Sequence, residues 1–149
     1  MRKHIKKWAG IAVLLASTQA QAQTPYTDDA TYRGLGAKAG IDRIVHTLIP
    51  LIQADARISE SFQDSDMLQL AERLAEQLCE FSGGPCKYTG KYKGKDMESV
   101  HIDLKISNAQ FNALAEDLQI AMERNGIAAA VQNKLIAKLA PMQRAIVTR

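Results

Sequence analysis

His101 is the first residue to consider for chemistry in this chain. It lies in the segment Met97–Ile106, whose other fixed points are apolar. An imidazole nitrogen in a dry pocket is a good ligand for iron, zinc or copper. The neighbouring sequence offers no C-x-x-C, no second histidine and no carboxylate partner, which fits few metal sites. A haem iron is one of them, because the porphyrin supplies four ligands and the protein adds one. Taken alone, however, such a histidine is more often an ordinary core or surface residue.

The first 22 residues have the pattern of a secretory signal peptide. Basic residues within positions 2–7 precede the apolar run Trp8–Ala16, which is too short to span a bilayer as a stable anchor. Ala20–Ala22 reads Ala-Gln-Ala, an A-x-A cleavage signal. We therefore expect cleavage after residue 22 and a periplasmic or secreted protein of residues 23–149, with an uncleaved anchor as the alternative.

Removal of the signal peptide changes the charge balance of the chain. The whole sequence has 19 Lys and Arg and 16 Asp and Glu. Four of the basic residues and none of the acidic ones lie in residues 1–22, which leaves 15 against 16 and a net charge of −1. This balance argues against nucleic acid as a partner, and no later segment resembles a membrane span. The remaining length suits one domain with a sizeable core, and low aromatic content favours helices.

Cys79 and Cys86 are the two cysteines of the chain. In an oxidising compartment such a pair predicts a disulfide, and Gly83-Gly84-Pro85 can turn the chain so that the cysteines meet. Two free thiols or a thiol metal site are the alternatives. Neither cysteine belongs to a C-x-x-C-H sequence, so covalent c-type haem attachment is excluded.

Apolar residues recur at spacings of three and four along most of the chain, which predicts an all-α fold. No segment shows the alternation of a strand. The expected helical segments in the first part of the chain are Thr31–Leu35, Lys38–Ala54, a short turn over Arg57–Phe62, Asp66–Ser82 and Met97–Leu104, with a kink at Pro50. The next helix begins at a capping box formed by Ser107 and Gln110 and ends at Asn125-Gly126. The last helix covers residues 131–146 and bends at Pro141.

One long loop separates the expected helix over Asp66–Ser82 from the segment that carries His101. Loops of this length without secondary structure tend to be functional. This loop leaves room for a flat ligand between the Leu70 and Leu74 face and His101.

With these residues in place, the chain resembles a truncated haemoglobin of the first of that family's three groups. The resemblance covers Leu35 to Val147, and the spacing is kept from Phe62 onward. The matching residues are Leu35-Gly36, Asp55, Arg57, Phe62, Asp66-Met67-x-x-Leu70, Gly83-Gly84-Pro85, Tyr88-Thr89-Gly90, Met97-x-x-x-His101, Ile106, Phe111 and Leu139-Ala140-Pro141-Met142. The resemblance implies a two-over-two helical sandwich around one haem b, formed by residues 35–149 after a loose segment of residues 23–34.

The resemblance also implies roles for single residues. His101 is similar to the proximal histidine that binds the iron, Phe62 to the aromatic residue that stacks on the porphyrin, and Arg73 to the basic residue that meets a haem propionate. The remaining expected cofactor contacts are Met67, Leu70 and Leu74 on the distal side, Ile49 on the first long helix, and Tyr88, Met97, Ile106, Phe111 and Leu114 around the rest of the pocket.

The chain departs from the family on the distal side. Members of the family commonly have Phe-Tyr on the first long helix and often a distal Gln, where this sequence has Leu48-Ile49 and Leu74. A hydrogen-bond donor beside bound oxygen stabilises the partial negative charge on the ligand, so we expect an apolar distal pocket without that donor. We place His46 and Gln77 at the surface, although either is near enough to turn inward.

The resemblance leaves three functional hypotheses. The first is a periplasmic haem protein that binds diatomic ligands (oxygen, nitric oxide or carbon monoxide) or transfers electrons from a periplasmic donor. The second is a peroxidase-like enzyme, which needs a distal His or Arg to move protons. The third is a globin-fold binding domain without haem. The physiological ligand, the redox partner and the oligomeric state stay open, and an optical spectrum separates the third hypothesis from the others.

Overall fold

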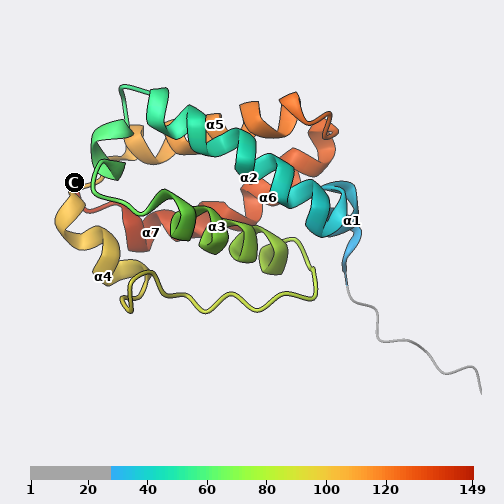
Figure 1. Ribbon diagram of the computed structural model, residues 1–149, viewed down its shortest axis with the longest axis horizontal. Helices are drawn as coiled ribbons and strands as arrows, with labels where there is room; N and C mark the ends of the chain where they lie inside the picture. Colours follow the sequence, from blue (N-terminus) through green and yellow to red (C-terminus); the bar gives the residue numbers. More distant parts are fainter. Residues whose placement is uncertain (1–27) are drawn as a thin grey trace, which may run out of the picture.

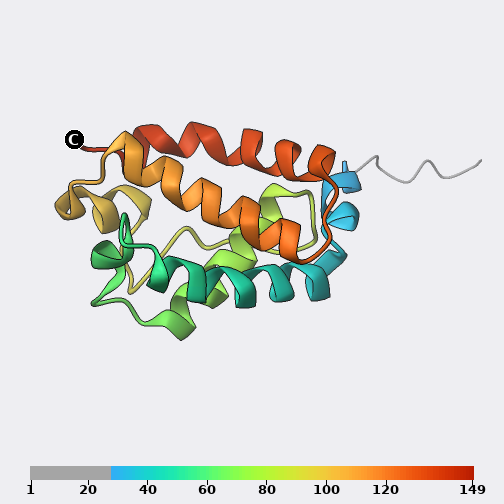
Figure 2. The same ribbon diagram turned by 90° about the horizontal axis from the view of Figure 1, so that it is seen from above.

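Four longer helices form two antiparallel pairs stacked on each other. The computed structural model describes residues 28–149, so the expected signal peptide lies outside the described residues. Helix α2 (Ala37–Ala54) pairs with α3 (Met67–Phe81), and α5 (Asn108–Arg124) pairs with α6 (Ala129–Leu139) (Figures 1 and 2). This is the all-α, two-over-two arrangement expected from the sequence.

Shorter elements connect the two pairs. They are α1 (Ala30–Gly34), the 3-10 helix η1 (Ser59–Phe62), α4 (Met97–His101), the 3-10 helices η2 (Ile102–Leu104) and η3 (Ala140–Met142), and α7 (Gln143–Ile146). Across residues 28–149 the only β pairing is an isolated bridge between Tyr92 and Lys95. None of the helices in this range is long and apolar enough to cross a membrane.

Side-chain caps fix where α3 and α5 begin. The Asp66 carboxylate accepts a hydrogen bond from the Gln69 backbone N–H at 3.0 Å at the start of α3. At the start of α5, Ser107 and Gln110 form the capping box expected from the sequence. Such caps satisfy N–H groups that have no partner within the helix. Gly83, at φ +90°, follows α3 in a conformation that favours glycine.

The two internal prolines behave differently. Helix α2 continues through the exposed Pro50 to Ala54. Pro141 divides the expected last helix, because α6 ends at Leu139 and the chain passes through η3 into α7. A proline lacks the N–H of an α-helical hydrogen bond, and a short 3-10 turn tolerates it better near its start.

The hydrophobic core lies between the two layers. The large apolar side chains with the least exposure, no more than 2%, come from α2, α5, α6 and the residue after α1. They are Leu35, Ile41, Ile44, Leu48, Ile52, Met122 and Leu135. The helical spacing along α2 is therefore a core pattern for most of its length, as expected by default for such a stripe.

Part of the expected loose segment 23–34 is helical. Residues 30–34 form α1, where Thr31 is buried and the Tyr32 N–H donates to the Ser82 carbonyl at 3.0 Å. Gly84 approaches the Tyr32 ring so closely that a Cβ atom there would lie 2.6 Å from it. The start of the domain is thus fastened to the end of α3.

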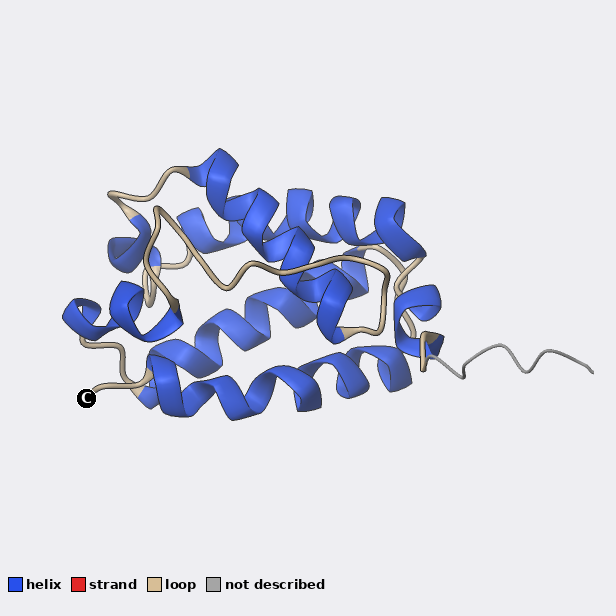
Figure 3. Cartoon of the chain, turned by 90° about the horizontal axis from the view of Figure 1, so that it is seen from below, coloured by secondary structure: helices blue, strands red, loops and turns tan. Residues whose placement is uncertain are grey.

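Residues 83–96, called the strap below, run back along α3 toward α4 without forming a helix. Figure 3 shows this segment crossing the face of α3. A disulfide joins Cys79 of α3 to Cys86 of the strap, with a Cα–Cα distance of 5.8 Å. This confirms the pairing predicted from the sequence.

Candidate functional site

A cavity of about 320 Å³ lies between the helix layers, α4 and the strap. This volume falls at the lower end of the range for small-molecule sites. Its lining is mainly apolar and comes from α2, α3, α4, α5, the strap and the segment from α6 to α7. The expected contacts that line it are His101, Phe62, Leu70, Arg73, Leu74, Tyr88, Met97, Ile106, Phe111 and Leu114.

His101 is the last residue of α4 and lines the cavity. Its Nδ1 lies 2.7 Å from the Met97 carbonyl oxygen, one helical turn earlier. A carbonyl only accepts hydrogen bonds, so Nδ1 carries the proton and Nε2 keeps a free lone pair. A second-shell bond of this kind fixes the ring and tautomer of a metal-binding histidine.

The surroundings of His101 do not supply a complete metal site. Within residues 28–149, no three His, Cys, Asp or Glu side chains come together in a way that would hold a metal ion. A metal bound by His101 therefore has to bring most of its own ligands.

Arg73 lines the cavity from α3 with a side chain that is 25% exposed. Its Nη1 is 2.8 Å from the Glu76 carboxylate and 3.4 Å from the Thr89 hydroxyl. Its Nε is buried without a hydrogen-bond partner. A buried unpaired donor on a charged group is costly, so this edge of the cavity favours an anionic group.

Gln77 corrects the expectation of a wholly apolar pocket. Its side chain is buried, lines the cavity and donates from Nε2 to the Met142 Sδ at 3.3 Å. We expected it at the surface, but Leu70, Leu74 and Gln77 follow each other at spacings of four and three and share one face of α3. His46 is exposed, as expected.

Ile49 and Met67 are expected contacts that do not line this cavity. Leu48, the preceding residue, lines it and is 2% exposed, whereas Ile49 is partly buried against the core. Successive helical residues point about 100° apart, so only one residue of this pair faces the cavity. Met67 begins α3 and instead borders a shallow surface pocket with Phe62.

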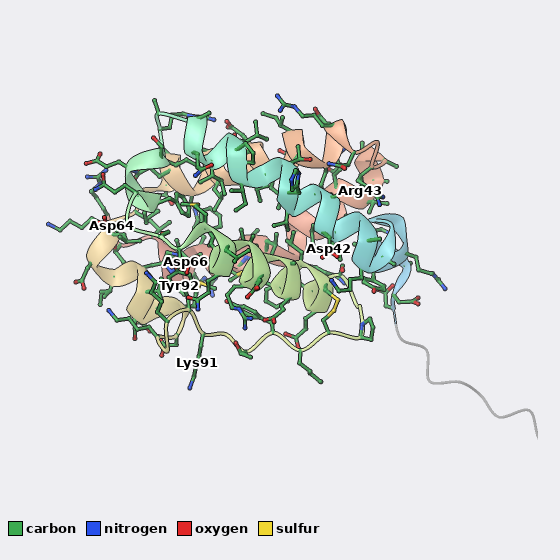
Figure 4. All side chains as sticks on the ribbon, viewed as in Figure 1. Asp42, Arg43, Asp64, Asp66, Lys91 and Tyr92 are labelled. Atoms are coloured by element: carbon green, nitrogen blue, oxygen red, sulfur yellow. A yellow bond between two sulfur atoms is a disulfide. The ribbon has the colours of Figure 1, made fainter. Side chains whose placement is uncertain are left out.

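The strap closes the side of the cavity opposite the core and contributes Tyr88, Tyr92 and Lys95. Burial raises the pKa of the Tyr88 hydroxyl, and the nearby Arg73 charge opposes that rise. The Tyr92 hydroxyl accepts from the Asp66 backbone N–H at 2.8 Å. Figure 4 shows Tyr92 beside Asp66, while Lys91 extends away from the molecule.

Sequence reasoning overlooked several cavity residues. Tyr92 and Lys95 lie in a segment without periodicity, so nothing in the sequence indicates which of its side chains turn inward. Val100 lines the cavity next to His101. Its apolar side chain in a short helix was the feature of the sequence that could have predicted this position.

Comparison with known proteins places the chain in a family. A family model described as bacterial-like globin matches residues 30–148. The group 1 truncated haemoglobin of Tetrahymena pyriformis is 28% identical over 103 residues, which cover 69% of this chain and 82% of that protein. The group 1 truncated haemoglobin GlbN of a Nostoc species is 25% identical over 118 residues, covering 79% and 97%.

Solved structures show the same fold. The truncated haemoglobin of Tetrahymena pyriformis in its Fe(III) form has a TM-score of 0.72 at 24% identity, covering 80% of this chain and 98% of that one. The group II truncated haemoglobin of Bacillus anthracis has a TM-score of 0.69 at 22% identity, covering 85% and 94%. The fold is thus that of the truncated globins, and since the family model spans most of the chain, this protein belongs to the bacterial-like globins as a homologue of the group 1 truncated haemoglobins.

Proposed function

We propose that this globin holds a non-covalent haem b through His101 and binds a small diatomic ligand. The observation that carries the proposal is His101 itself, whose Nδ1 is held by the Met97 carbonyl inside a mainly apolar cavity. When bound, the haem supplies an iron with an open coordination position for oxygen, nitric oxide or carbon monoxide.

The residues around the cavity fit a haem in two further ways. Phe62, Phe111 and the leucines of α3 give an apolar surface for a flat, hydrophobic molecule. The unpartnered Nε of Arg73 fits a carboxylate such as a haem propionate. The chain has no C-x-x-C-H sequence, which excludes covalent attachment of the c type.

The side of the cavity formed by α2 and α3 favours a weakly held oxygen. Leu48, Leu70 and Leu74 present hydrocarbon there, and Gln77 is the carboxamide among them. A charged or partly charged ligand gains from a hydrogen-bond donor, while a ligand with little charge gains less. We therefore propose fast oxygen release, moderated by Gln77, with a smaller effect on carbon monoxide.

No observation favours the peroxidase-like alternative. That chemistry needs a side chain that moves protons at the ligand. His46 is exposed, and the Arg73 guanidinium is paired with Glu76.

We further propose that the protein works in the periplasm or another oxidising compartment, where it receives electrons from a donor protein. Support comes from the basic, apolar and A-x-A pattern of residues 1–22 and from the Cys79–Cys86 disulfide. Fusion of residues 1–22 to a reporter that is active only after export tests the location. A fusion that stays in the cytoplasm would refute it.

The test of haem binding is the absorption spectrum of the purified protein. We expect a Soret band at one haem per chain, and a shift of that band when carbon monoxide is added to the reduced protein. A protein that stays haem-free in the presence of excess haem would instead support a globin-fold binding domain without haem.

A further inference from the structure

We propose that the strap is a redox-controlled gate, so that reduction of the Cys79–Cys86 disulfide frees it and speeds exchange of the molecule in the cavity. The identity of that molecule as haem rests on the proposed function. The release of the strap itself rests only on the contacts of this chain.

The strap begins with backbone N–H bonds from Gly83 and Gly84 to the Glu80 and Cys79 carbonyls, and the Tyr88 ring lies near that of Phe81. Four further ties hold it to α3. Cys86 is bonded to Cys79, and the Tyr88 N–H donates to the Glu80 carboxylate at 3.2 Å. Further along, Arg73 donates to the Thr89 hydroxyl at 3.4 Å, and the Asp66 N–H donates to the Tyr92 hydroxyl at 2.8 Å. From Cys86 to Tyr92 the partners move from Cys79 and Glu80 near the end of α3, through Arg73, to Asp66 at its N-cap. The ties therefore hold the strap lengthwise over the helix.

The same segment forms a wall of the cavity. Tyr88, Gly90, Tyr92 and Lys95 line it from the strap, and α3 lines it with Leu70, Arg73, Leu74 and Gln77. A strap that lifts from α3 takes its tyrosines out of the lining, which opens the cavity to solvent between the helix and α4.

The disulfide is the one covalent tie between the strap and α3. Residues 85–91 form no regular secondary structure, and their contacts with α3 at Glu80 and Arg73 are single, partly exposed hydrogen bonds. A Cβ atom at Gly90 or Gly94 would meet nothing within 4 Å, so the strap is not closely packed at these two positions. Closing an eight-residue ring corresponds in the chain-entropy picture to a factor of up to about 70 in an equilibrium constant.

The two cysteines differ in exposure, and this difference indicates which sulfur a reductant attacks. Cys79 is 2% exposed within the core, whereas Cys86 is only partly buried. A thiolate of a dithiol reductant attacks the Cys86 sulfur, a new S–S bond forms, and Cys79 leaves and takes up a proton. The second thiolate of the reductant then attacks the reductant's first sulfur, which is bonded to Cys86, and Cys86 leaves and takes up a proton. The reductant departs as a cyclic disulfide, and the protein holds two thiols.

Limited proteolysis measures strap release independently of any cofactor. Lys87, Lys91 and Lys93 are exposed trypsin sites on the strap, and Lys134 on α6 is an exposed site far from it in sequence. After dithiothreitol treatment of the purified full chain, we expect cleavage at the strap sites to become about tenfold faster or more, while cleavage after Lys134 stays unchanged. Equal rates at the strap sites before and after reduction would overturn the proposal.

Transfer of haem to an excess of an apo-globin scavenger measures gating. We expect faster haem loss from the reduced protein and from the double variant Cys79→Ala/Cys86→Ser. The matched control is Asn125→Ala, which removes a 3.0 Å hydrogen bond to Thr47 between α5 and α2 and leaves the strap ties in place. If the double variant does not fold, the reduced wild type with an unchanged far-ultraviolet circular dichroism spectrum gives the same measurement.

The outcomes separate the two proposals. Faster cleavage together with faster haem loss supports the gate. Faster cleavage with unchanged haem loss shows a strap that opens without gating and overturns it. A chain that carries no haem but shows faster strap cleavage refutes the proposed function, while it supports strap release by reduction.

Discussion

Gln77 is the polar residue among the apolar side chains on the side of the cavity formed by α2 and α3, where we expect the diatomic ligand to bind. Its carboxamide has two N–H donors, and the acceptor that the structure gives it is the Met142 thioether, a weak one. A buried amide group with one weak partner is under-satisfied. It can therefore turn toward a ligand at a small cost in lost contacts.

We predict that Gln77→Leu speeds oxygen release by roughly 2- to 13-fold, the range for loss of one ordinary hydrogen bond. Release of carbon monoxide should change much less, because that ligand carries less charge. Flash photolysis and stopped-flow mixing on both proteins measure the rates. An unchanged oxygen rate would mean that Gln77 serves only to join α3 to Met142.

Leu48 is the position at which a hydroxyl donor can be restored. We predict that Leu48→Tyr slows oxygen release by a factor of about 10 to 150, the worth of a hydrogen bond to a charged acceptor, with little effect on carbon monoxide. Ile49→Tyr is the matched control, since Ile49 does not line the cavity. If Ile49→Tyr slows release and Leu48→Tyr does not, the assignment of the facing residue is wrong.

The sequence predicted residues near His101 better than those on the ligand side. Met97, His101, Ile106 and Phe111 keep the family spacing across a short segment, and all four line the cavity. On α2, an error of one residue rotates the side chain by about 100°, which is why Ile49 was expected where Leu48 lies. The inward turn of Gln77 depends on where η3 places Met142, a tertiary contact that no local pattern reveals.

At the scale of elements, the capping box explains why the sequence predicted the start of α5 correctly. The Ser107 hydroxyl accepts from the Gln110 N–H, and the Gln110 side chain accepts from the Ser107 N–H. Since α5 carries Phe111 and Leu114 into the cavity, the cap also sets the register of those side chains.

We predict that Ser107→Ala lowers the free energy of unfolding by about 1 kcal/mol, because it leaves a helix N–H without a partner. Chemical denaturation of the haem-free and the haem-loaded protein measures the change. Ser99→Ala is the comparison, since Ser99 is exposed and the N-cap of its helix is Asp96. The Ser99 N–H and side chain both hydrogen-bond the Asp96 carboxylate. If the free energy of unfolding falls equally in the two variants, the capping hydrogen bond of Ser107 makes no contribution of its own.

Elements without periodicity were harder to predict. The long helices follow from stripes at spacings of three and four, and Gly83 with Pro85 indicated where α3 ends. The path of the strap is set by the disulfide and by single contacts such as Tyr92 with Asp66, which are long-range facts. The passage from α4 into η2, and from α6 through η3 into α7, also depends on packing against the other layer.

At the scale of the whole molecule, the buried carboxyl of Asp117 on α5 costs stability at neutral pH. Burial raises its pKa above the usual 3.8, the nearby Asp55 and Glu116 charges add to the rise, and Arg57 opposes it. A raised pKa means that the folded state prefers the protonated acid. Its stabilising contribution is therefore complete below pH 3.8 and is lost as the pH rises through the pKa of the folded state.

We predict that Asp117→Asn increases the free energy of unfolding at neutral pH, and that the gain disappears below pH 3.8. Denaturant unfolding at the two pH values measures it. Asp42→Asn is the comparison, because Asp42 is exposed and pairs with Lys38 on the surface. A loss of stability in Asp117→Asn at neutral pH would show that the charged carboxylate has a partner that compensates its burial.

At this scale, the proposed function depends on His101 as the ligand of a haem iron. The most direct measurement is the absorption spectrum of His101→Gly, expressed and purified beside His46→Gly, which removes an exposed histidine. We predict that His101→Gly loses most of its haem and that added imidazole, by occupying the vacated space, restores the Soret band, while His46→Gly keeps a wild-type spectrum. An unchanged ferrous spectrum and unchanged haem affinity in His101→Gly would contradict the account.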